Sequence, residues 1–232
     1  MDTAMDIVLV PGLWLDASCW DAVVPLLEKA GHHPHPLTLP GLESRGADRS
    51  GVHVADQVEA VVAAIDAADA PVLLVGHSLG CAIAWGALDA RVDRVAKAVY
   101  VGGWPAAGGA PLAAGFPTKG PDLVLPGPDD FDEADLRDLG YDALAARAIP
   151  SPATLTTEGL ELTDERRYGV PALFVCPEYT ADQLRAWVAD GEASVAEIAR
   201  LEDVAYADVP TGHWPQLTRP EELAAVLVAA AG

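Results

Sequence analysis

The residues best suited to chemistry lie in the run Gly76-His77-Ser78-Leu79-Gly80. This run follows the apolar stretch Pro71–Val75 and precedes Cys81–Leu88, so a serine with a glycine two positions to either side stands on a predicted strand-to-helix turn. Such a turn admits only small residues at those two positions, and it presents the hydroxyl at a helix N-terminus, where negative charge is favoured. The pattern predicts Ser78 as a nucleophile. A phosphate-binding loop, the other interpretation of a glycine-rich turn, would need a Lys-Ser or Lys-Thr ending that this run lacks.

A serine hydroxyl becomes a good nucleophile only when a base removes its proton and a third group holds that base. In chains with this kind of turn the order is serine, acid, histidine. His213 follows the last predicted strand, Val204–Val209, and precedes the final predicted helix. It therefore falls at the carboxyl edge of a parallel sheet, where ligands bind in open α/β folds. We predict His213 as the base.

The acid is expected near the end of the preceding strand, Pro171–Cys176, and two carboxylates are available there. Glu178 comes almost directly after the strand. Asp182 lies in a predicted helix start of the capping-box kind, where it is more naturally a first-turn acid that stabilises the helix dipole. We predict Glu178 as the acid and keep Asp182 as the alternative.

Negative charge that develops on a substrate carbonyl needs two N–H donors. One is predicted at Leu79, directly after the serine, and the other at Leu13, in the Pro-Gly turn after the first strand. Trp14, Trp104 and Trp214 fall on loops predicted to rim the site. These three side chains are therefore candidates for an apolar substrate-binding pocket.

Strands and helices alternate along most of the chain, which predicts a parallel sheet covered by helices on both faces. Apolar runs predict strands over residues 6–10, 35–39, 72–75, 95–101, 171–176 and 204–209. Helical patterns cover residues 19–30, with Ser18 as a cap, and also 52–68, 81–88 and 220–230. The predicted fold class is α/β, with a mostly parallel sheet of about six strands.

The stretch between Pro105 and Gly169 breaks this alternation, because it holds no convincing core strand. It opens with a loop rich in glycine, proline and alanine, and a short acidic helix is predicted over residues 135–148. A structureless loop of this length is uncommon inside a compact domain. We expect residues 106–169 to form a small lid inserted into a core made of residues 1–105 and 170–232.

On these motifs the chain resembles the α/β-hydrolase superfamily, and within it the small serine esterases that include plant methylesterases and hydroxynitrile lyases. The resemblance is carried by Val8–Trp14, Cys19–His32, Leu39-Pro40-Gly41, Gly76–Gly80 and Gly212-His213. It implies the α/β-hydrolase fold and catalysis by serine, histidine and an acid. Pro11 stands where these proteins usually have a histidine before the glycine, and Trp214 stands where the lyases have a lysine. The second difference argues against cyanohydrin cleavage.

The composition excludes several classes of partner. The chain has 232 residues, enough for one α/β domain with a small insertion, and a formal net charge of −21, which repels nucleic acid. No apolar run is long enough to cross a bilayer, and the acidic start Met1–Asp6 is unlike a signal peptide, so we expect a cytoplasmic protein with no membrane partner. Three widely spaced cysteines and the run His32-His33-Pro34-His35 predict neither a disulfide framework nor a metal site.

We therefore expect a serine hydrolase that cleaves a small, mostly apolar, uncharged ester or related acyl compound through an acyl-enzyme. The partner is a small-molecule substrate, and the chemistry needs no cofactor. Two other functions fit the same residues: carbon–carbon bond hydrolysis by the same serine and histidine, and a non-catalytic binding protein built on this scaffold. The fold alone does not choose among substrates.

Overall fold

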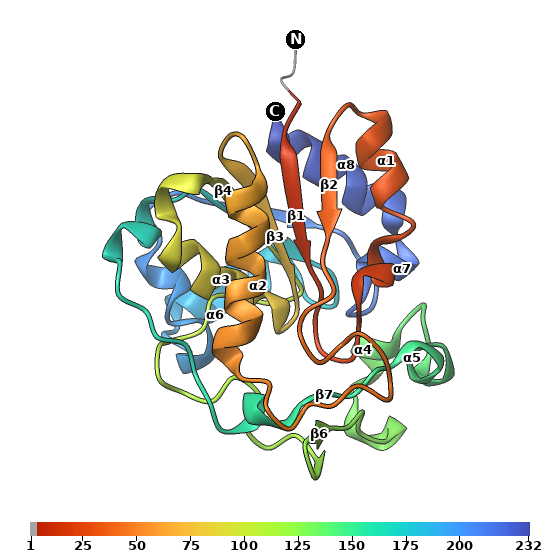
Figure 1. The fold of residues 1–232 in the computed structure, drawn as a ribbon. Helices are drawn as coiled ribbons and strands as arrows, with labels where there is room; N and C mark the ends of the chain where they lie inside the picture. The colour runs from red at the N-terminus through yellow and green to blue at the C-terminus, as the bar shows by residue number, and fades with distance from the viewer. Residues whose placement is uncertain (1–3) are drawn as a thin grey trace.

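A parallel sheet of six strands runs through the centre of the molecule, in the order β2-β1-β3-β4-β8-β9 (Figure 1). Every neighbouring pair in it is parallel. The strands are β1 (Asp6–Val10), β2 (His33–Pro36), β3 (Val72–His77), β4 (Val95–Val101), β8 (Ala172–Cys176) and β9 (Val204–Asp208). The predicted α/β fold with a mostly parallel sheet of about six strands is confirmed. The strand order reverses between β2-β1 and β3, and the carboxyl ends of strands at such a switch point are where ligands bind.

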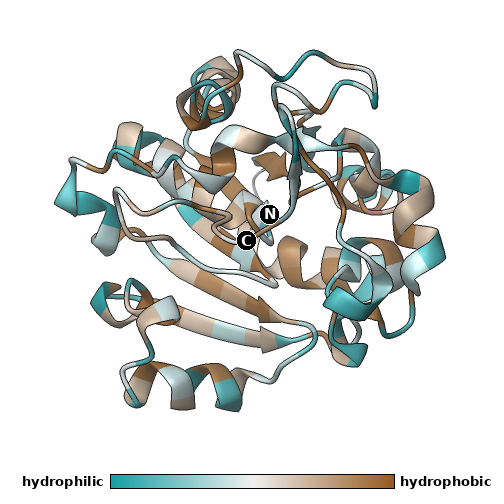
Figure 2. Ribbon diagram, turned by 90° about the horizontal axis from the view of Figure 1, so that it is seen from below, coloured by the Kyte–Doolittle hydropathy of each residue, from teal (hydrophilic) through white to brown (hydrophobic). Residues whose placement is uncertain are grey.

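Helices cover both faces of the sheet because side chains along each strand alternate between the two faces. In β1, Val8 and Val10 face one buried cluster, while Ile7 and Leu9 face the other. The first cluster contains side chains from α2 (Val54–Ala67), α3 (Gly80–Ala90) and α6 (Ala181–Ala189). The second contains side chains from α1 (Val24–Lys29) and α8 (Pro220–Ala231), and the short helix α7 (Pro215–Thr218) leads into α8. Figure 2 shows the hydrophobic character of the strands between these layers.

The stretch that joins β4 to β8 forms small elements of its own. Its three short strands, β5 (Thr118–Lys119), β6 (Asp122–Leu123) and β7 (Ser151–Pro152), pair antiparallel, and its helices are α4 (Glu133–Leu136) and α5 (Tyr141–Arg147). In Figure 1 the elements β6, β7, α4 and α5 lie together beyond the carboxyl ends of β1 and β2. Short 3-10 helices lie at Ala17–Trp20, Val92–Arg94, Pro128–Asp130, Ala153–Thr156, Glu165–Gly169, Ala193–Val195 and Ile198–Arg200.

Three predicted elements differ from the observed ones. The helix predicted over residues 19–30 is a 3-10 turn followed by α1, because Pro25 fits only the first turn of a helix, and the turn is capped by Asp16 instead of Ser18. The second strand, predicted over residues 35–39, is β2 at His33–Pro36. It begins earlier because His33 pairs with Asp6 of β1. The acidic helix predicted over residues 135–148 is split into α4 and α5, with left-handed backbone at Asp138 (φ 66°) and Gly140 (φ 77°) between them.

The structure describes residues 4–232, so the first three residues of the predicted core and half of the acidic start Met1–Asp6 lie outside it. Of the helices that this described part forms, none combines the length and apolar character that a membrane span requires.

A buried ion pair ties the end of α3 to the chain that leads into β8. The Arg167 and Asp89 side chains are each only 4% exposed, and Arg167 Nη1 lies 3.0 Å from Asp89 Oδ1. The backbone N–H groups of Thr163 and Asp164 also donate to the Asp89 carboxylate, each at 2.9 Å. The Asp89 carboxylate therefore neutralises a buried guanidinium and satisfies two backbone donors at once.

Replacing Asp89 by asparagine is expected to lower the free energy of unfolding by about 3 kcal/mol, because it removes the buried counter-charge of the Arg167 guanidinium and leaves only the exposed Glu165, at 3.6 Å. Urea unfolding monitored by tryptophan fluorescence measures the change. The matched control is Asp66→Asn, which removes an ion pair to Arg91 whose side chains are 40% and 45% exposed. Exposed pairs contribute little, so equal losses in the two variants would contradict the role assigned to burial.

Candidate active site

Ser78 stands on a tight turn between β3 and α3, with a backbone conformation that L residues rarely adopt. Its φ is 53°, in the left-handed region, and two hydrogen bonds fix it there. The Ser78 N–H donates to the Val101 carbonyl at 2.9 Å, and the Ser78 carbonyl accepts from the Cys81 N–H at 2.9 Å. The turn therefore holds the serine between two neighbouring strands and the first turn of a helix.

The glycines around this turn are required by close approach. A Cβ atom added at Gly80 would collide with the backbone of Pro11, and one added at Gly76 would lie 2.7 Å from Cys81 Cα. A Cβ atom at Gly12 would lie 2.8 Å from the Cβ atom of Ser78. The loop after β1 is thus pressed directly against the serine turn, which explains the glycines at both places.

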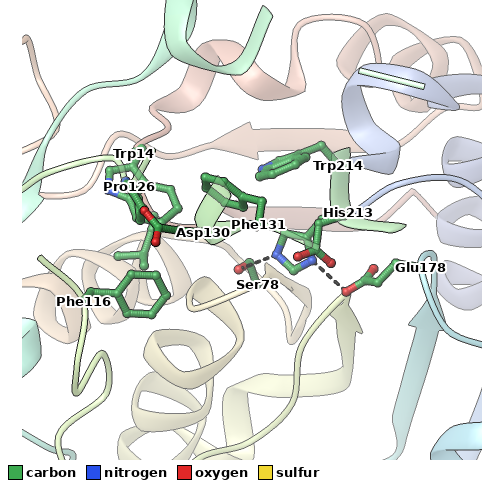
Figure 3. A pocket seen from close by; sticks show the side chains of 11 residues that line it. Trp14, Ser78, Phe116, Pro126, Asp130, Phe131, Glu178, His213 and Trp214 are labelled. Carbon is green, nitrogen blue, oxygen red and sulfur yellow. Dashed lines mark hydrogen bonds and ion pairs between the residues drawn. The ribbon is translucent and has the colours of Figure 1, made fainter. Parts of the chain in front are cut away.

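A line of hydrogen bonds joins three side chains that are far apart in the sequence (Figure 3). His213 Nε2 lies 2.8 Å from Ser78 Oγ, and His213 Nδ1 lies 2.7 Å from Glu178 Oε1. Glu178 follows β8 and His213 follows β9, so both reach the same edge of the sheet as Ser78. With the Nδ1–H donated to the carboxylate, the Nε2 lone pair faces the serine hydroxyl, which is the arrangement a general base requires.

The acidic surroundings of His213 raise its pKa. Burial by itself would lower this pKa, but the hydrogen bond to Glu178, the Glu178 charge and the charge of Asp135 together raise it above its usual range. A carboxylate that accepts a hydrogen bond from the imidazole N–H and faces its cation stabilises the protonated form. The site is thus built to hold a positive charge on His213.

The neighbouring His77 has a different role, because it is completely buried. Burial first, and then the nearby His213, lower the pKa of His77 to about 3, so its imidazole stays neutral. Its Nε2–H donates to the main-chain carbonyl of His213 at 2.8 Å. His77 therefore holds the backbone of the histidine loop in place.

The two predicted oxyanion donors lie on either side of Ser78 in the fold. Leu13 belongs to the loop after β1 and lines the cavity beside Ser78, and Leu79 is the residue directly before α3. Within residues 4–232, neither the Leu13 N–H nor the Leu79 N–H donates to a protein acceptor. Both amides are therefore free to bind a ligand.

A cavity of about 280 Å³ opens over the serine. It is lined by Leu13, Trp14, Ser78, Phe116, Pro126, Asp130, Phe131, Asp135, Glu178, His213 and Trp214. The aromatic rings meet edge to face, at 5.6 Å between the Trp14 and Phe116 centroids and 6.2 Å between Phe131 and Trp214 (Figure 3). The cavity combines an apolar wall with a polar end at the Ser78–His213–Glu178 line.

Two sequence candidates lie away from this cavity. Trp104 was expected at its rim, but it does not line the cavity that the described residues form, and its ring packs against Tyr179 and Trp187 at centroid distances of 6.0 and 6.4 Å. Asp182, the alternative acid, is 94% exposed and pairs with Arg185 at 2.8 Å. The predicted capping box of Thr180 and Gln183 is present at the start of α6.

Sequence reasoning did not find Asp130, Phe131 and Asp135, which reach the cavity from the stretch between β4 and β8. Their local sequence is simply acidic, and no motif marks it. In the described part of the chain, Asp135, Glu178 and His213 form the one group of three or more residues whose potential metal-ligand atoms lie within 4.8 Å of one another. Both ring nitrogens of His213 already have hydrogen-bond partners in this group of contacts, Ser78 and Glu178.

A parallel α/β sheet with a serine on a tight strand-to-helix turn and a histidine after the last strand defines the α/β-hydrolase class. The chain belongs to the alpha/beta hydrolase family, since the model of that family matches residues 7–226. This family membership agrees with the resemblance found from the sequence.

Individual relatives add to this assignment. A pyrethroid hydrolase from Sphingobium wenxiniae is 37% identical over 101 residues, which are 43% of this chain and 36% of that protein. This chain thus matches only about a third of the length of that relative.

Three solved structures share the fold over nearly the whole of both chains. The pyrethroid hydrolase PytH has a TM-score of 0.70 at 23% identity, with 99% of this chain and 98% of that chain covered. Tomato methylketone synthase I, complexed with 2-tridecanone, has a TM-score of 0.73 at 18% identity, with the same coverage. A methylesterase from Arabidopsis has a TM-score of 0.68 at 17% identity, with 98% of each chain covered. Likenesses at these identities show the fold alone.

Proposed function

We propose that the protein is a serine carboxylesterase that cleaves a small, mostly apolar ester through an acyl-enzyme. The observation that carries this proposal is the continuous hydrogen-bonded line from Ser78 Oγ through His213 to Glu178. It ends in a cavity whose other wall is aromatic. Nucleophile, base and orienting acid are the three parts that serine-based acyl transfer requires.

In the first half of the reaction, Ser78 Oγ attacks the ester carbonyl carbon while His213 Nε2 takes the hydroxyl proton. The carbonyl oxygen becomes an oxyanion, which the N–H groups of Leu13 and Leu79 stabilise. The C–O bond to the alcohol then breaks, and His213 gives its proton to the departing alkoxide. The products of this half are an alcohol and an ester of Ser78.

In the second half, His213 takes a proton from a water molecule, which attacks the acyl carbon of the Ser78 ester. The same two N–H groups stabilise the second oxyanion. When the Ser78–acyl bond breaks, the proton returns from His213 to Ser78 Oγ, and the carboxylic acid that leaves gives its remaining proton to solvent. Glu178 stabilises the imidazolium that forms in each half.

The size of the cavity supports a small substrate. A volume of about 280 Å³ lies at the lower end of ligand pockets, which typically measure about 300 to 1,000 Å³. The relative named as a pyrethroid hydrolase supports hydrolysis as the reaction class. An apolar wall formed by Trp14, Phe131 and Trp214 suits an uncharged acyl or alcohol group.

We further propose that residues 106–169 act as a lid over this cavity. Support comes from the five lining residues that this stretch supplies, Phe116, Pro126, Asp130, Phe131 and Asp135. A lid that supplies most of one wall excludes water from the serine and sets which acyl groups fit.

A fluorophosphonate probe and a panel of p-nitrophenyl esters test the proposal together. We expect one probe molecule per chain, attached to Ser78 in a tryptic digest, and the highest kcat/KM for short acyl chains, falling about tenfold or more beyond eight carbons because the cavity is small. Ser194, an exposed serine, is the internal control and should remain unlabelled. Labelling without turnover of any ester would favour carbon–carbon bond hydrolysis, and absence of labelling would favour a binding protein.

A further inference from the structure

The end of α4 and the chain just after it are hydrogen-bonded to the loop that carries His213. We call residues 135–138 the clamp. The main-chain carbonyl of Asp135 accepts the His213 N–H at 2.9 Å, and the Asp138 carboxylate accepts from Thr211 Oγ1 at 3.0 Å. Asp138 also pairs with Arg219, at 3.0 Å, beyond the histidine loop. The clamp therefore fixes the histidine loop from both sides of Gly212.

The clamp also reaches the loop that carries Glu178. The guanidinium of Arg137 donates to the carbonyls of Thr211 and Pro177, the residues that lie two before His213 and one before Glu178. Gly212 has no room for a side chain, because a Cβ atom there would collide with the carbonyls of Asp135 and Arg137. One short segment from the proposed lid thus bridges the loops of the base and the acid.

The side chain of Asp135 brings a second carboxylate to the histidine. Its carboxylate lies within 4.8 Å of ligand atoms of both Glu178 and His213, and the residue is half-buried and lines the cavity. Its carboxylate accepts a hydrogen bond from the backbone of Asp132, the N-cap residue of α4, and among residues 4–232 it makes no hydrogen bond to another side chain. Two carboxylates therefore face one imidazole.

The charges in this group depend on one another. Burial and the charge of Glu178 raise the pKa of Asp135, whereas the charge of His213 lowers it. Protonation of His213 therefore favours the ionised form of Asp135, and ionised Asp135 favours protonated His213. This mutual stabilisation is strongest in the state in which the histidine has taken the serine proton.

We propose that Asp135 is a positioning residue for the Ser78–His213 pair: its carbonyl holds the main chain of His213 in place, and its carboxylate shares with Glu178 the stabilisation of the imidazolium. This inference rests on the proposed serine hydrolase function. It assigns part of the catalytic machinery to the inserted segment, so the proposed lid and the triad act as one unit.

The other charged groups around His213 do not supply this effect. His77, from the end of β3, stays neutral because burial lowers its pKa to about 3. Arg137 is directed at the carbonyls of Thr211 and Pro177. Glu178, from the loop after β8, and Asp135, from α4, are the carboxylates that face the ring.

The test begins with NMR titration of the His213 imidazole in the wild-type protein and in Asp135→Asn, with the signal assigned by its loss in His213→Gln. The pKa of His213 is expected to fall by about 0.5 to 1 unit in Asp135→Asn, because a carboxylate that favours the cation is replaced by a neutral group. Asp129→Asn changes an exposed acid in the same stretch that does not line the cavity, so it should leave the titration unchanged. Asp135→Ser provides a second neutral variant should the asparagine variant fold poorly.

Kinetics supply the second readout. In Asp135→Asn the acid limb of the kcat/KM profile is expected to move to lower pH by the same amount, since His213 acts as a base only when neutral. At the plateau, kcat is expected to fall about 3- to 30-fold with little change in KM, and Asp135→Glu should recover part of the loss.

The outcomes separate this inference from the proposed function. An active wild-type enzyme whose His213 titration and acid limb are the same in Asp135→Asn and Asp135→Ser would overturn the inference. If the wild-type protein turned over no ester at all, the proposed function would be overturned. The NMR titration would still decide whether Asp135 acts on His213. Equal effects from Asp129→Asn would also overturn the inference, because they would assign the shift to the general acidity of the chain.

Discussion

Ser78→Ala is expected to lower kcat for p-nitrophenyl esters by about 10⁴- to 10⁶-fold while the protein stays folded. The serine hydroxyl is the atom that forms the acyl-enzyme, so the histidine and the acid have nothing to activate once it is removed. The free N–H groups of Leu13 and Leu79 remain, and they leave a residual rate above that of the uncatalysed reaction. Initial rates at saturating ester, with active-site titration of the wild type, measure the ratio.

Stability should move little in this variant, because the hydroxyl contributes one hydrogen bond, to His213, at the edge of a cavity. The thermal unfolding midpoint is therefore measured beside the rate. Ser194→Ala, at an exposed position, is the matched control and should retain full activity. An enzyme that kept more than about a tenth of its activity without the Ser78 hydroxyl would refute the acyl-enzyme mechanism.

The parts of the fold that follow from local pattern were predictable from the sequence. β4, which runs over Val95–Val101, lies where the apolar run predicted it, because a parallel strand covered on both faces is mostly apolar, and its one charged residue, Lys97, is only partly buried. The turn at Ser78 was also recognisable, since its glycines are dictated by contacts with residues close in sequence and with Pro11. Chain order and strand position then pointed to His213 and Glu178, which the structure brings into contact.

The parts that depend on distant contacts were not predictable. Asp135 reaches His213 only because α4 and the chain after it fold back on the loop after β9, and the neighbours of Asp135 in the sequence are ordinary surface acids. Trp104 was assigned to the pocket from its position on a loop, but its ring is held by Tyr179 and Trp187, which follow β8. Asp135 and Trp104 both lie in the stretch between β4 and β8. No periodic pattern in that stretch predicts the direction of a side chain.

The break between α4 and α5, at residues with positive φ, is a backbone feature that the sequence also did not predict. The acidic stretch over residues 135–148 has a helical composition, yet Asp138 and Gly140 adopt positive φ and divide it. Asp138 is held by Thr211 and Arg219, both distant in sequence. A non-glycine residue is kept in such a conformation by surrounding contacts, so composition alone does not reveal the break.

The second large effect is expected at the acid. Glu178→Gln should lower kcat by about 10²- to 10⁴-fold, with KM changed much less. The Glu178 carboxylate accepts the Nδ1–H of His213 at 2.7 Å and so keeps the Nε2 lone pair toward Ser78. A glutamine removes the charge that stabilises the imidazolium, and its NH₂ group favours the opposite tautomer, in which Nε2 carries the proton and does not accept one from the serine.

The same substitution is also expected to shift the pH dependence of kcat/KM. Because the hydrogen bond and charge of Glu178 raise the pKa of His213 against the opposing effect of burial, their removal should move the acid limb of the kcat/KM profile to lower pH. The histidine in the variant is thus neutral over a wider pH range, yet the enzyme is slower at every pH. A slow variant with an unshifted limb would mean that Glu178 acts by packing and not by charge.

Asp182→Asn is the matched control, because it changes the other acid after β8 by the same chemistry. Its side chain is 94% exposed and pairs with Arg185, so its loss should leave both kcat and the acid limb as they are in the wild type. Glu178→Asp keeps the charge but shortens the side chain, and its kcat should lie between those of the wild type and the glutamine variant. If Asp182→Asn were the slower of the two neutral variants, the acid of the triad would have to be reassigned, together with the hydrogen-bonded line from which the mechanism is derived.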